Sequence, residues 1–209
     1  MNGLRLGGPQ LGEVIVVMGM GIVGQLGLQL AALTGPRLLV AMDLSDRRLE
    51  MASALGADET INPASCDPVE RLRELTGGEM ADLVLDATGA PQAFPLAMEL
   101  GGPRARVVLV GSTRGEVKEV DVYTQIHCKG LVIIGAHAAT HPAAETPYNK
   151  WTRPRNRQLA IELVSRGRLK VKPMITHRFP FDRAVEAFDL LVKDRTQAIG
   201  VILEYRGSG

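Results

Sequence analysis

Cysteines, aromatic residues and long apolar runs are all scarce in this chain of 209 residues. Its two cysteines, Cys66 and Cys128, lie far apart and form neither a Cys-x-x-Cys pair nor a zinc-ligand spacing, so a reduced, cytoplasmic protein is expected. No run reaches the roughly 18 apolar residues of a membrane-spanning helix, and no signal peptide opens the chain. Membrane association is therefore not expected.

An excess of one charge is also missing, because 24 basic and 23 acidic residues give a net charge of +1. This balance does not favour nucleic acid or an anionic membrane surface as a partner. Arg153, Arg155 and Arg157 form a local cluster, for which a solvated loop is the favoured interpretation. The hydrophobic content of 45% is typical of a globular chain with a substantial core.

Short apolar runs alternate with helical patterns over most of the chain. The expected strands are residues 14–18, Leu38–Met42, Glu59–Ile61, Leu83–Asp86, Arg106–Val110 and Leu131–Ile134, and the helices between them include Ile22–Leu33, residues 45–55 and Pro68–Leu75. This alternation predicts an α/β fold with a doubly wound, parallel, six-stranded Rossmann sheet. Ligands of such sheets bind at the carboxyl ends of the strands.

A glycine-rich turn follows the first strand, with the spacing Gly-x-Gly-x-x-Gly at Gly19, Gly21 and Gly24. We expect Gly19 to permit the tight turn, Gly21 to let the backbone approach a pyrophosphate, and Gly24 to let the helix pack on the sheet. Ile22 and Val23 begin that helix, whose unpaired N–H groups and dipole favour an anion. The alternative is a glycine-rich turn that binds nothing.

Other strand ends carry residues that suit the same ligand. Asp43 ends the second strand, where a carboxylate accepts hydrogen bonds from an adenosine ribose and repels a 2′-phosphate, so NAD is favoured over NADP. Thr88-Gly89, Gly111-Ser112 and Gly135-Ala136 close three later strands. Turn chemistry alone is the alternative explanation for these later glycines.

The remainder of the chain follows a different pattern. The expected elements are a loop at His141–Asn156 with the only tryptophan, Trp151, then a helix at Arg157–Val164, an extended segment at Lys172–His177, a helix at Asp182–Val192 and a strand at Ile199–Leu203. In the helix at Asp182–Val192, the residues Ala184, Ala187, Phe188 and Leu191 share one apolar face, which is typical of an amphipathic helix.

The whole pattern resembles the medium-chain dehydrogenase/reductase superfamily, in its zinc-type alcohol and polyol dehydrogenase branch. The stretches that carry the resemblance are residues 17–24, Leu55-Gly56-Ala57-Asp58, Asp86-Ala87-Thr88-Gly89, Val108-Leu109-Val110-Gly111, and Ile175-Thr176-His177-Arg178-Phe179 leading into residues 184–188. The resemblance implies hydride transfer between a nicotinamide and a small alcohol, aldehyde or ketone.

Members of that branch begin with a GroES-like catalytic domain, and none of its motifs is present here. The resemblance therefore implies a nucleotide-binding domain at residues 1–140, followed at residues 141–209 by a loop, a closing helix and a segment that returns to the absent domain. Zinc is expected for the full-length family, but the chain offers no ligand set and no catalytic residue. His137 and His141 are four apart, which is too few ligands for a tetrahedral site.

The resemblance assigns only cofactor-binding residues. These are Gly19, Gly21, Ile22, Val23 and Gly24 at the pyrophosphate, Asp43 and Arg48 at the ribose, Thr88 and Gly89 beside the adenine, and Val110, Gly111, Ser112, Gly135, Ala136 and His137 at the nicotinamide. For Arg48 a surface helix arginine is an equal alternative. Some relatives place a basic pyrophosphate ligand in the last strand, where this chain has Gly200.

Three hypotheses about function follow. The chain is an NAD-dependent dehydrogenase by descent, a stand-alone NAD-binding module without turnover, or one part of an enzyme whose catalytic domain another polypeptide supplies. Relatives that dimerise pair their sixth strands, so a homodimer through Leu131–Ile134 is expected, unless the loop at residues 137–156 covers that edge.

Overall fold

The computed structural model describes residues 1–117, 120–193, 196 and 198–205. Its strands are β1 (Val14–Met18), β2 (Leu38–Met42), β3 (Glu59–Ile61), β4 (Ala81–Asp86), β5 (Gly101–Leu109), β6 (Val132–Gly135), β7 (Ile175–Pro180) and β8 (Gly200–Glu204). Its α-helices are α1 (Asn2–Gly7), α2 (Ile22–Ala32), α3 (Asp46–Ala54), α4 (Pro68–Thr76), α5 (Phe94–Leu100), α6 (Arg153–Ser165) and α7 (Ala184–Lys193). Short helical turns are η1 (Pro91–Ala93), η2 (Val122–His127), η3 (Ala138–Thr140), η4 (Lys172–Met174) and η5 (Phe181–Arg183).

Six strands form one parallel sheet in the order β3-β2-β1-β4-β5-β6. The chain starts at the centre of the sheet, builds one half outward to β3, then crosses back to β4 and builds the other half. This is the doubly wound Rossmann topology, with its switch point between β1 and β4. The fold prediction is confirmed.

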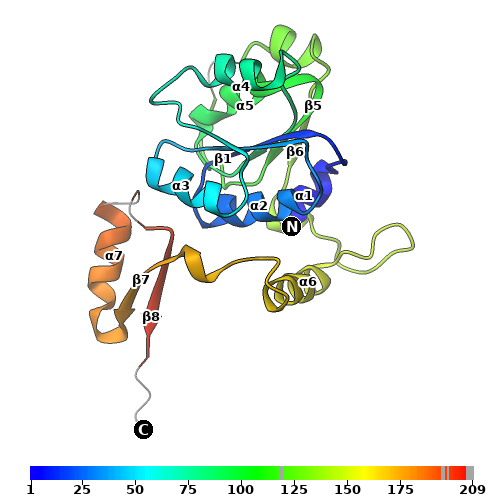
Figure 1. Cartoon of the computed structure of the whole chain (residues 1–209). Coiled ribbons are helices and arrows are strands. Elements are labelled where there is room, and N and C mark those ends of the chain that lie inside the picture. Colours follow the sequence, from blue (N-terminus) through cyan, green and yellow to red (C-terminus); the bar gives the residue numbers. More distant parts are fainter. Residues whose placement is uncertain (118–119, 194–195, 197, 206–209) are drawn as a thin grey trace.

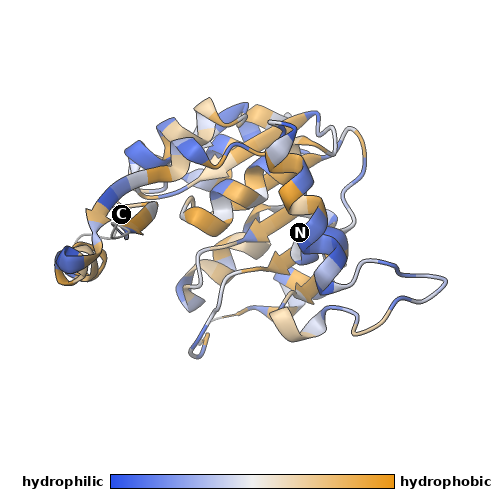
Figure 2. Cartoon of the chain, turned by 90° about the horizontal axis from the view of Figure 1, so that it is seen from below, coloured by the Kyte–Doolittle hydropathy of each residue, from blue (hydrophilic) through white to orange (hydrophobic). Residues whose placement is uncertain are grey.

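Helices cover both faces of this sheet, as Figure 1 shows with α4 and α5 on one side and α1, α2 and α3 on the other. Every residue of β1 is buried, so its run of apolar side chains supplies both faces at once. Val14, Val16 and Met18 belong to the core beneath α4 and α5, and Ile15 and Val17 belong to the core beneath α2 and α3. The hydrophobic colour of the central strands in Figure 2 reflects this double burial.

Local signals explain where several helices begin and end. Asp67 caps α4, because its carboxylate accepts hydrogen bonds from the N–H groups of Val69 and Glu70 at 2.9 and 3.1 Å. Gly77 ends that helix in the left-handed conformation, at φ +61°. Both signals are visible in the sequence.

Two helices differ from the sequence-based expectations. Helix α1 was not expected, because its six residues include two glycines and show no helical period; Arg106 holds its end by donating to the carbonyl oxygens of Gly7 and Gly8 at 2.8 and 2.7 Å. Helix α6 begins at Arg153 and not at residue 157, since Pro154 suits the first turn of a helix. The expected loop at His141–Asn156 therefore ends four residues early.

The C-terminal elements form a separate, two-stranded parallel sheet of β7 and β8, with α7 against it (Figure 1). Lys172–Met174 is a helical turn and not extended, and the helix expected from Asp182 starts with η5. The amphipathic helix α7 covers its apolar face only in part: Ala187 is buried, but Phe188 is 64% exposed because nothing in the described part of the chain packs over it.

Gln29 of α2 fixes the chain that leads into these elements. Its side chain accepts a hydrogen bond from the N–H of Lys170 at 2.7 Å and donates one to the carbonyl oxygen of the same residue at 3.1 Å. Gln29 is buried, so these two bonds form away from water. They hold the start of the C-terminal region against the Rossmann sheet.

Candidate functional site

The turn after β1 uses its three glycines in different ways. Gly19 has a left-handed φ of +84°, and a Cβ there would lie 2.9 Å from the backbone of Thr88. A Cβ at Gly24 would overlap the carbonyl oxygen of Gly19, so this glycine lets α2 meet the turn backbone to backbone. A Cβ at Gly21 would meet no atom within 4 Å, so Gly21 faces open space. Ile22 and Val23 follow it at the exposed start of α2.

Asp43 joins this turn to the end of β2. Its Oδ2 accepts a hydrogen bond from the N–H of Met20 at 2.6 Å, and its Oδ1 accepts one from the N–H of Ser45 at 2.9 Å. Only 10% of the side chain is exposed. The carboxylate is therefore fixed in orientation, and each oxygen keeps a further lone pair for a ligand hydroxyl.

Arg48 lies beside this carboxylate and reaches the C-terminal region. Its Nη1 is 3.8 Å from Oδ2 of Asp43, and its Nη2 donates to the carbonyl oxygen of Ala198 at 3.3 Å. The backbone carbonyl of Arg48 accepts a hydrogen bond from the buried Gln25 side chain at 2.8 Å. The side chain is 19% exposed, which argues against the surface helix arginine that was the alternative.

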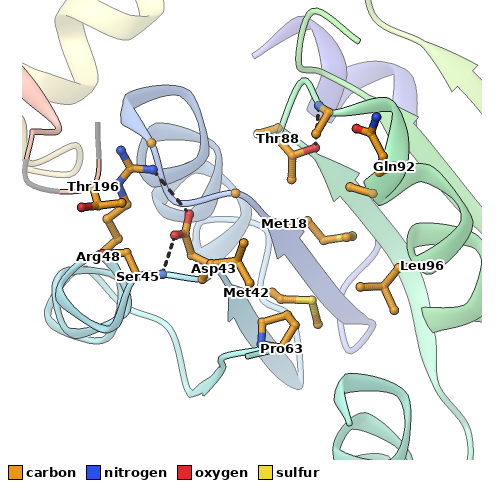
Figure 3. Close-up of a pocket in the computed structure, with 16 residues that line it drawn as sticks. Met18, Met42, Asp43, Ser45, Arg48, Pro63, Thr88, Gln92, Leu96 and Thr196 are labelled. Carbon is orange, nitrogen blue, oxygen red and sulfur yellow. Dashed lines mark hydrogen bonds and ion pairs between the residues drawn. The ribbon is translucent and has the colours of Figure 1, made fainter. Parts of the chain in front are cut away.

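These groups surround a cavity of about 510 Å³ at the carboxyl ends of β1, β2 and β4 (Figure 3). Five of the expected residues line it: Gly19, Gly21, Asp43, Arg48 and Thr88. The charged and hydroxyl groups of Asp43, Arg48 and Thr196 gather at one end, as Figure 3 shows.

Apolar side chains and one amide line the rest of this cavity, and the sequence pattern did not single them out. They include Met18, Met42, Pro63, Gln92 and Leu96. Met18 and Met42 are the last residues of β1 and β2, so the rule that ligands bind at strand ends is the signal that could have found them. A slot with apolar walls and a polar end has the character of a small-ligand site.

The turns after β4 and β5 pack against each other next to this cavity. Buried Asp86 accepts hydrogen bonds at Oδ1 from the N–H and the hydroxyl of Thr88, at 2.9 and 2.6 Å. Its carbonyl oxygen accepts the N–H of Gly111 at 2.9 Å. A Cβ at Gly111 would overlap the N–H of Gly89, and a Cβ at Gly89 would lie 3.5 Å from Ser112. The structure thus brings Gly89, Gly111 and Ser112 together, but they do not line the cavity.

The remaining expected residues lie on the side of the sheet that α1 and α2 cover. Val23, Gly24 and Val110 line a second cavity, of about 240 Å³. Val110 and Ala136 both contact α1, since a Cβ at Gly3 would lie 2.8 Å from Val110 Cγ2 and 3.3 Å from Ala136 Cβ.

Gly135 and His137 are exposed at the end of β6. The ring of His137 is engaged locally, because its Nδ1 accepts the N–H of Ala139 at 3.1 Å.

A metal centre does not assemble from the residues that the structure describes. Within them, no group of three or more His, Cys, Asp or Glu side chains could hold a metal ion. The Nδ1 atoms of His137 and His141 are both engaged by the backbone of the same short segment, at Ala139 N–H and the Ala138 carbonyl oxygen. The donor set of this part of the chain therefore does not fit a catalytic zinc, which needs three protein ligands. None of the described helices is long and apolar enough to cross a membrane.

Gly200 begins β8 at a point of close backbone approach. A Cβ there would lie 2.6 Å from the carbonyl oxygen of Met174. A larger side chain would therefore push β8 away from the residues before β7. Packing explains why glycine stands at this position, where some relatives of the expected family carry a basic residue.

Comparison with known proteins supports one family. A model of the family described as zinc-binding dehydrogenase matches residues 23–152. L-threonine 3-dehydrogenase of Pyrococcus horikoshii is 32% identical over 200 residues, which cover 95% of this chain and 54% of that protein. The chain spans about half the length of the curated relatives it matches.

Solved structures agree with the family match. The alcohol dehydrogenase of Thermus sp. ATN1 is 28% identical, with a TM-score of 0.81 over 98% of this chain and 54% of that chain. A protein of Escherichia coli CFT073 described as a short chain alcohol dehydrogenase, complexed with the cofactor NADH, is 27% identical, with a TM-score of 0.77 over 96% of this chain and 54% of that chain.

Proposed function

The chain belongs to the zinc-binding dehydrogenase family, and from this we propose that it binds a nicotinamide cofactor, NAD in preference to NADP, for hydride transfer between that cofactor and a small alcohol or carbonyl compound. The observation that carries the proposal is the 510 Å³ cavity, in which an anchored carboxylate faces a glycine turn with open space above Gly21. A bound nicotinamide supplies hydride acceptance and donation. The chain's own residues bind and orient it.

Adenosine is the part of the cofactor that the cavity fits. Met18, Met42 and Leu96 offer apolar surface for a purine, and Asp43 offers acceptor lone pairs for the ribose hydroxyls. A 2′-phosphate would bring negative charge next to the Asp43 carboxylate, which Arg48 offsets only in part from 3.8 Å. We therefore propose the preference for NAD.

The pyrophosphate and the nicotinamide would lie along the exposed start of α2 and the ends of β5 and β6. The open space at Gly21 would let the pyrophosphate approach the backbone closely. The N–H groups in the first turn of α2 suit an anion. We propose Gly89, Gly111, Ser112, Gly135, Ala136, Val110 and His137 as the wall toward the nicotinamide. Residues 1–140 would then form the nucleotide-binding unit.

A second candidate function is an NAD-binding module without turnover of its own. The observation that favours it is the missing metal-ligand group within the described residues. The two candidates share the cofactor site and differ only in where the groups that act on the substrate come from. Under both, a cytoplasmic location is part of the proposal, supported by the free, exposed thiols of Cys66 and Cys128.

We also propose a homodimer through Leu131–Ile134. In the described part of the chain, β6 ends the sheet and pairs only with β5, so one row of its backbone groups faces outward. Val132 is 49% exposed there. An unpaired edge with an exposed apolar side chain suits pairing with a second copy.

Titration of the purified chain with NADH tests the cofactor proposal. Transfer of NADH from water into the cavity is expected to enhance and blue-shift its fluorescence in a saturable way, and NADPH is expected to bind at least about tenfold more weakly. NAD should compete with NADH, which separates binding in the site from adsorption. Absence of saturable binding by either reduced cofactor would contradict the proposal.

A further inference from the structure

A pocket of about 360 Å³, away from the cofactor cavity, is lined by Asn2, Arg5, Leu6, Thr140, Pro142, Asn149 and Trp151. It lies between α1 and the loop that follows β6. These segments are far apart in the sequence, and Asn2 joins them by donating a hydrogen bond to Thr140 Oγ1 at 2.9 Å.

Arg5 is held in this pocket by two contacts, neither of which is an ion pair. Its guanidinium carbon lies 3.5 Å from the centroid of the Trp151 ring, and its Nε donates to Asn156 Oδ1 at 2.9 Å. Asn156 is 5% exposed and is itself fixed through a bond to the Trp151 carbonyl at 3.3 Å. The stacking plane and the Nε bond together orient the planar guanidinium, so that its terminal N–H groups are aimed before any ligand arrives.

The charge of Arg5 is not balanced by any carboxylate of the described residues. Burial lowers the pKa of Arg5 with no acidic group opposing it, although an arginine stays charged. The Lys150 ammonium adds a second cation, 5.2 Å from the same ring centroid. Glu145 is the acid of the neighbouring loop, and Arg155 already pairs with it. Lys150 also interacts with Glu145, so Arg5 is the group that supplies an oriented positive charge without a carboxylate partner among the described residues, beside hydroxyl and amide groups.

We propose that this pocket is an oxyanion site that takes the carboxylate or phosphate of the substrate, so that the preferred alcohols are anionic. The arginine fork offers parallel N–H donors to two oxygens of either group, and Asn2, Asn149 and Thr140 supply further polar atoms. Its place suits this role, because α1 packs against β5 and β6, where a Cβ at Gly3 would meet Val110 and Ala136 of the proposed nicotinamide wall. The assignment to the substrate, unlike the binding of the anion, rests on the proposed function.

Trp151 fluorescence can report anion binding at this pocket, since Trp151 is the only tryptophan of the chain and stacks on Arg5. The experiment is a titration of Trp151 fluorescence with potassium phosphate and, separately, sodium acetate, with sodium chloride at matched ionic strength as the control. We expect a saturable change in Trp151 fluorescence, half-complete at about 1 mM anion. Saturation by phosphate alone, acetate alone or both identifies the anion class; a response no different from chloride overturns the proposal.

Three variants distinguish an anion site from the alternative that Arg5 only stabilises the packing of α1 against the loop after β6. Arg5→Gln should weaken anion binding at least about tenfold. Asn156→Asp should do the same, because it places a carboxylate against the guanidinium of Arg5, while the loss of the bond from Asn156 Nδ2 to the Trp151 carbonyl is checked by thermal unfolding. Arg157→Gln is the matched control, because Arg157 is exposed in the same helix as Asn156 and does not line the pocket; this variant should bind as the wild type does. If anion binding survives both Arg5→Gln and Asn156→Asp in folded protein, the site is wrongly assigned.

NADH binding is measured on the same variants by its own fluorescence. Arg5→Gln should leave NADH affinity unchanged. A variant that loses the Trp151 response to anions but still binds NADH therefore tests the anion site separately from the cofactor site. A wild type that binds anions but not NADH would contradict the proposed function and leave the oxyanion site standing. A wild type that binds NADH but shows no anion response would contradict only the oxyanion site.

Discussion

Gly21, Gly24 and Gly27 occupy successive positions of one turn and helix, yet replacing them should have three different effects. A Cβ at Gly21 or Gly27 would meet no atom within 4 Å, whereas a Cβ at Gly24 would overlap the carbonyl oxygen of Gly19. Gly21 lines the cofactor cavity, and Gly27 does not. The variants Gly21→Val, Gly24→Ala and Gly27→Ala therefore separate ligand contact, packing and helix propensity.

The magnitudes follow from these surroundings. In Gly24→Ala the clash is with backbone, which cannot rotate away, so overpacking should destabilise the fold by about 1–3 kcal/mol. For a chain of this size that lowers the melting temperature by about 2–12 °C. Gly27→Ala should stabilise by about 0.5–1 kcal/mol, because alanine is the better helix former. Gly21→Val has an ordinary backbone φ of −68° and should change stability by about 1 kcal/mol or less.

The effects of these substitutions on NADH affinity should not follow their effects on stability. The valine side chain of Gly21→Val would fill the space where the pyrophosphate is proposed to approach, so NADH affinity should fall at least about 100-fold, or about 2.7 kcal/mol. Gly27→Ala should bind as the wild type does. Thermal unfolding followed by circular dichroism gives the stabilities, and NADH fluorescence gives the affinities. Unchanged affinity in Gly21→Val would remove the glycine turn from the site, and an unchanged melting temperature in Gly24→Ala would refute the close approach.

Three further outcomes are expected. Asp43→Asn keeps the shape of the side chain but removes its charge, so the preference for NADH over NADPH should narrow by about 1–3 kcal/mol; a preference that stays the same would remove Asp43 from the discrimination. Val132→Lys places a charge on the exposed edge of the sheet and should convert a dimer to a monomer in size-exclusion chromatography with light scattering; a dimer indifferent to this lysine would rule out the β6 interface. Ile133 is unsuitable for that test, because it packs against the core. The isolated chain should show no zinc-dependent oxidation across a panel of alcohols, and robust activity would contradict the ligand count.

The sequence predicts the central sheet well because its strands are buried on both faces. Leu38–Met42 has the bounds expected for it, since an apolar run between turn residues admits little else. The edge strand Glu59–Ile61 also has its expected bounds, although only Ile61 is buried. The glycine turn and Asp43 can also be predicted from the sequence, because their residue types and their positions after β1 and β2 are typical of a nucleotide-binding turn and a ribose-binding acid. Gly19, Gly21, Asp43, Arg48 and Thr88 line one cavity, and their role toward a cofactor stays a prediction.

Features that depend on distant partners were beyond the sequence. Periodicity shows only that one face of α7 is apolar, whereas the exposure of Phe188 depends on which elements pack against that face. The contact between Arg5 and Trp151 joins residues 146 positions apart and has no local signal. Helix α1 was missed because tertiary bonds from Arg106, rather than helix propensity, hold it in place. Pro154, by contrast, was a helix-start signal that the sequence displayed.

The three loops that end β1, β4 and β5 touch one another through main chain alone. Gly19 meets Thr88, and Gly111 meets Gly89, with no side chain between them that could change rotamer. Substitutions at Gly19 and Gly111 would therefore act on the same short segment, residues 87–89. The second substitution would meet a segment that the first had already displaced, so their combined effect should be smaller than the sum of the two. The two glycines therefore act as one unit in the stability of this edge of the sheet, and neither can be assigned a cost independently of the other.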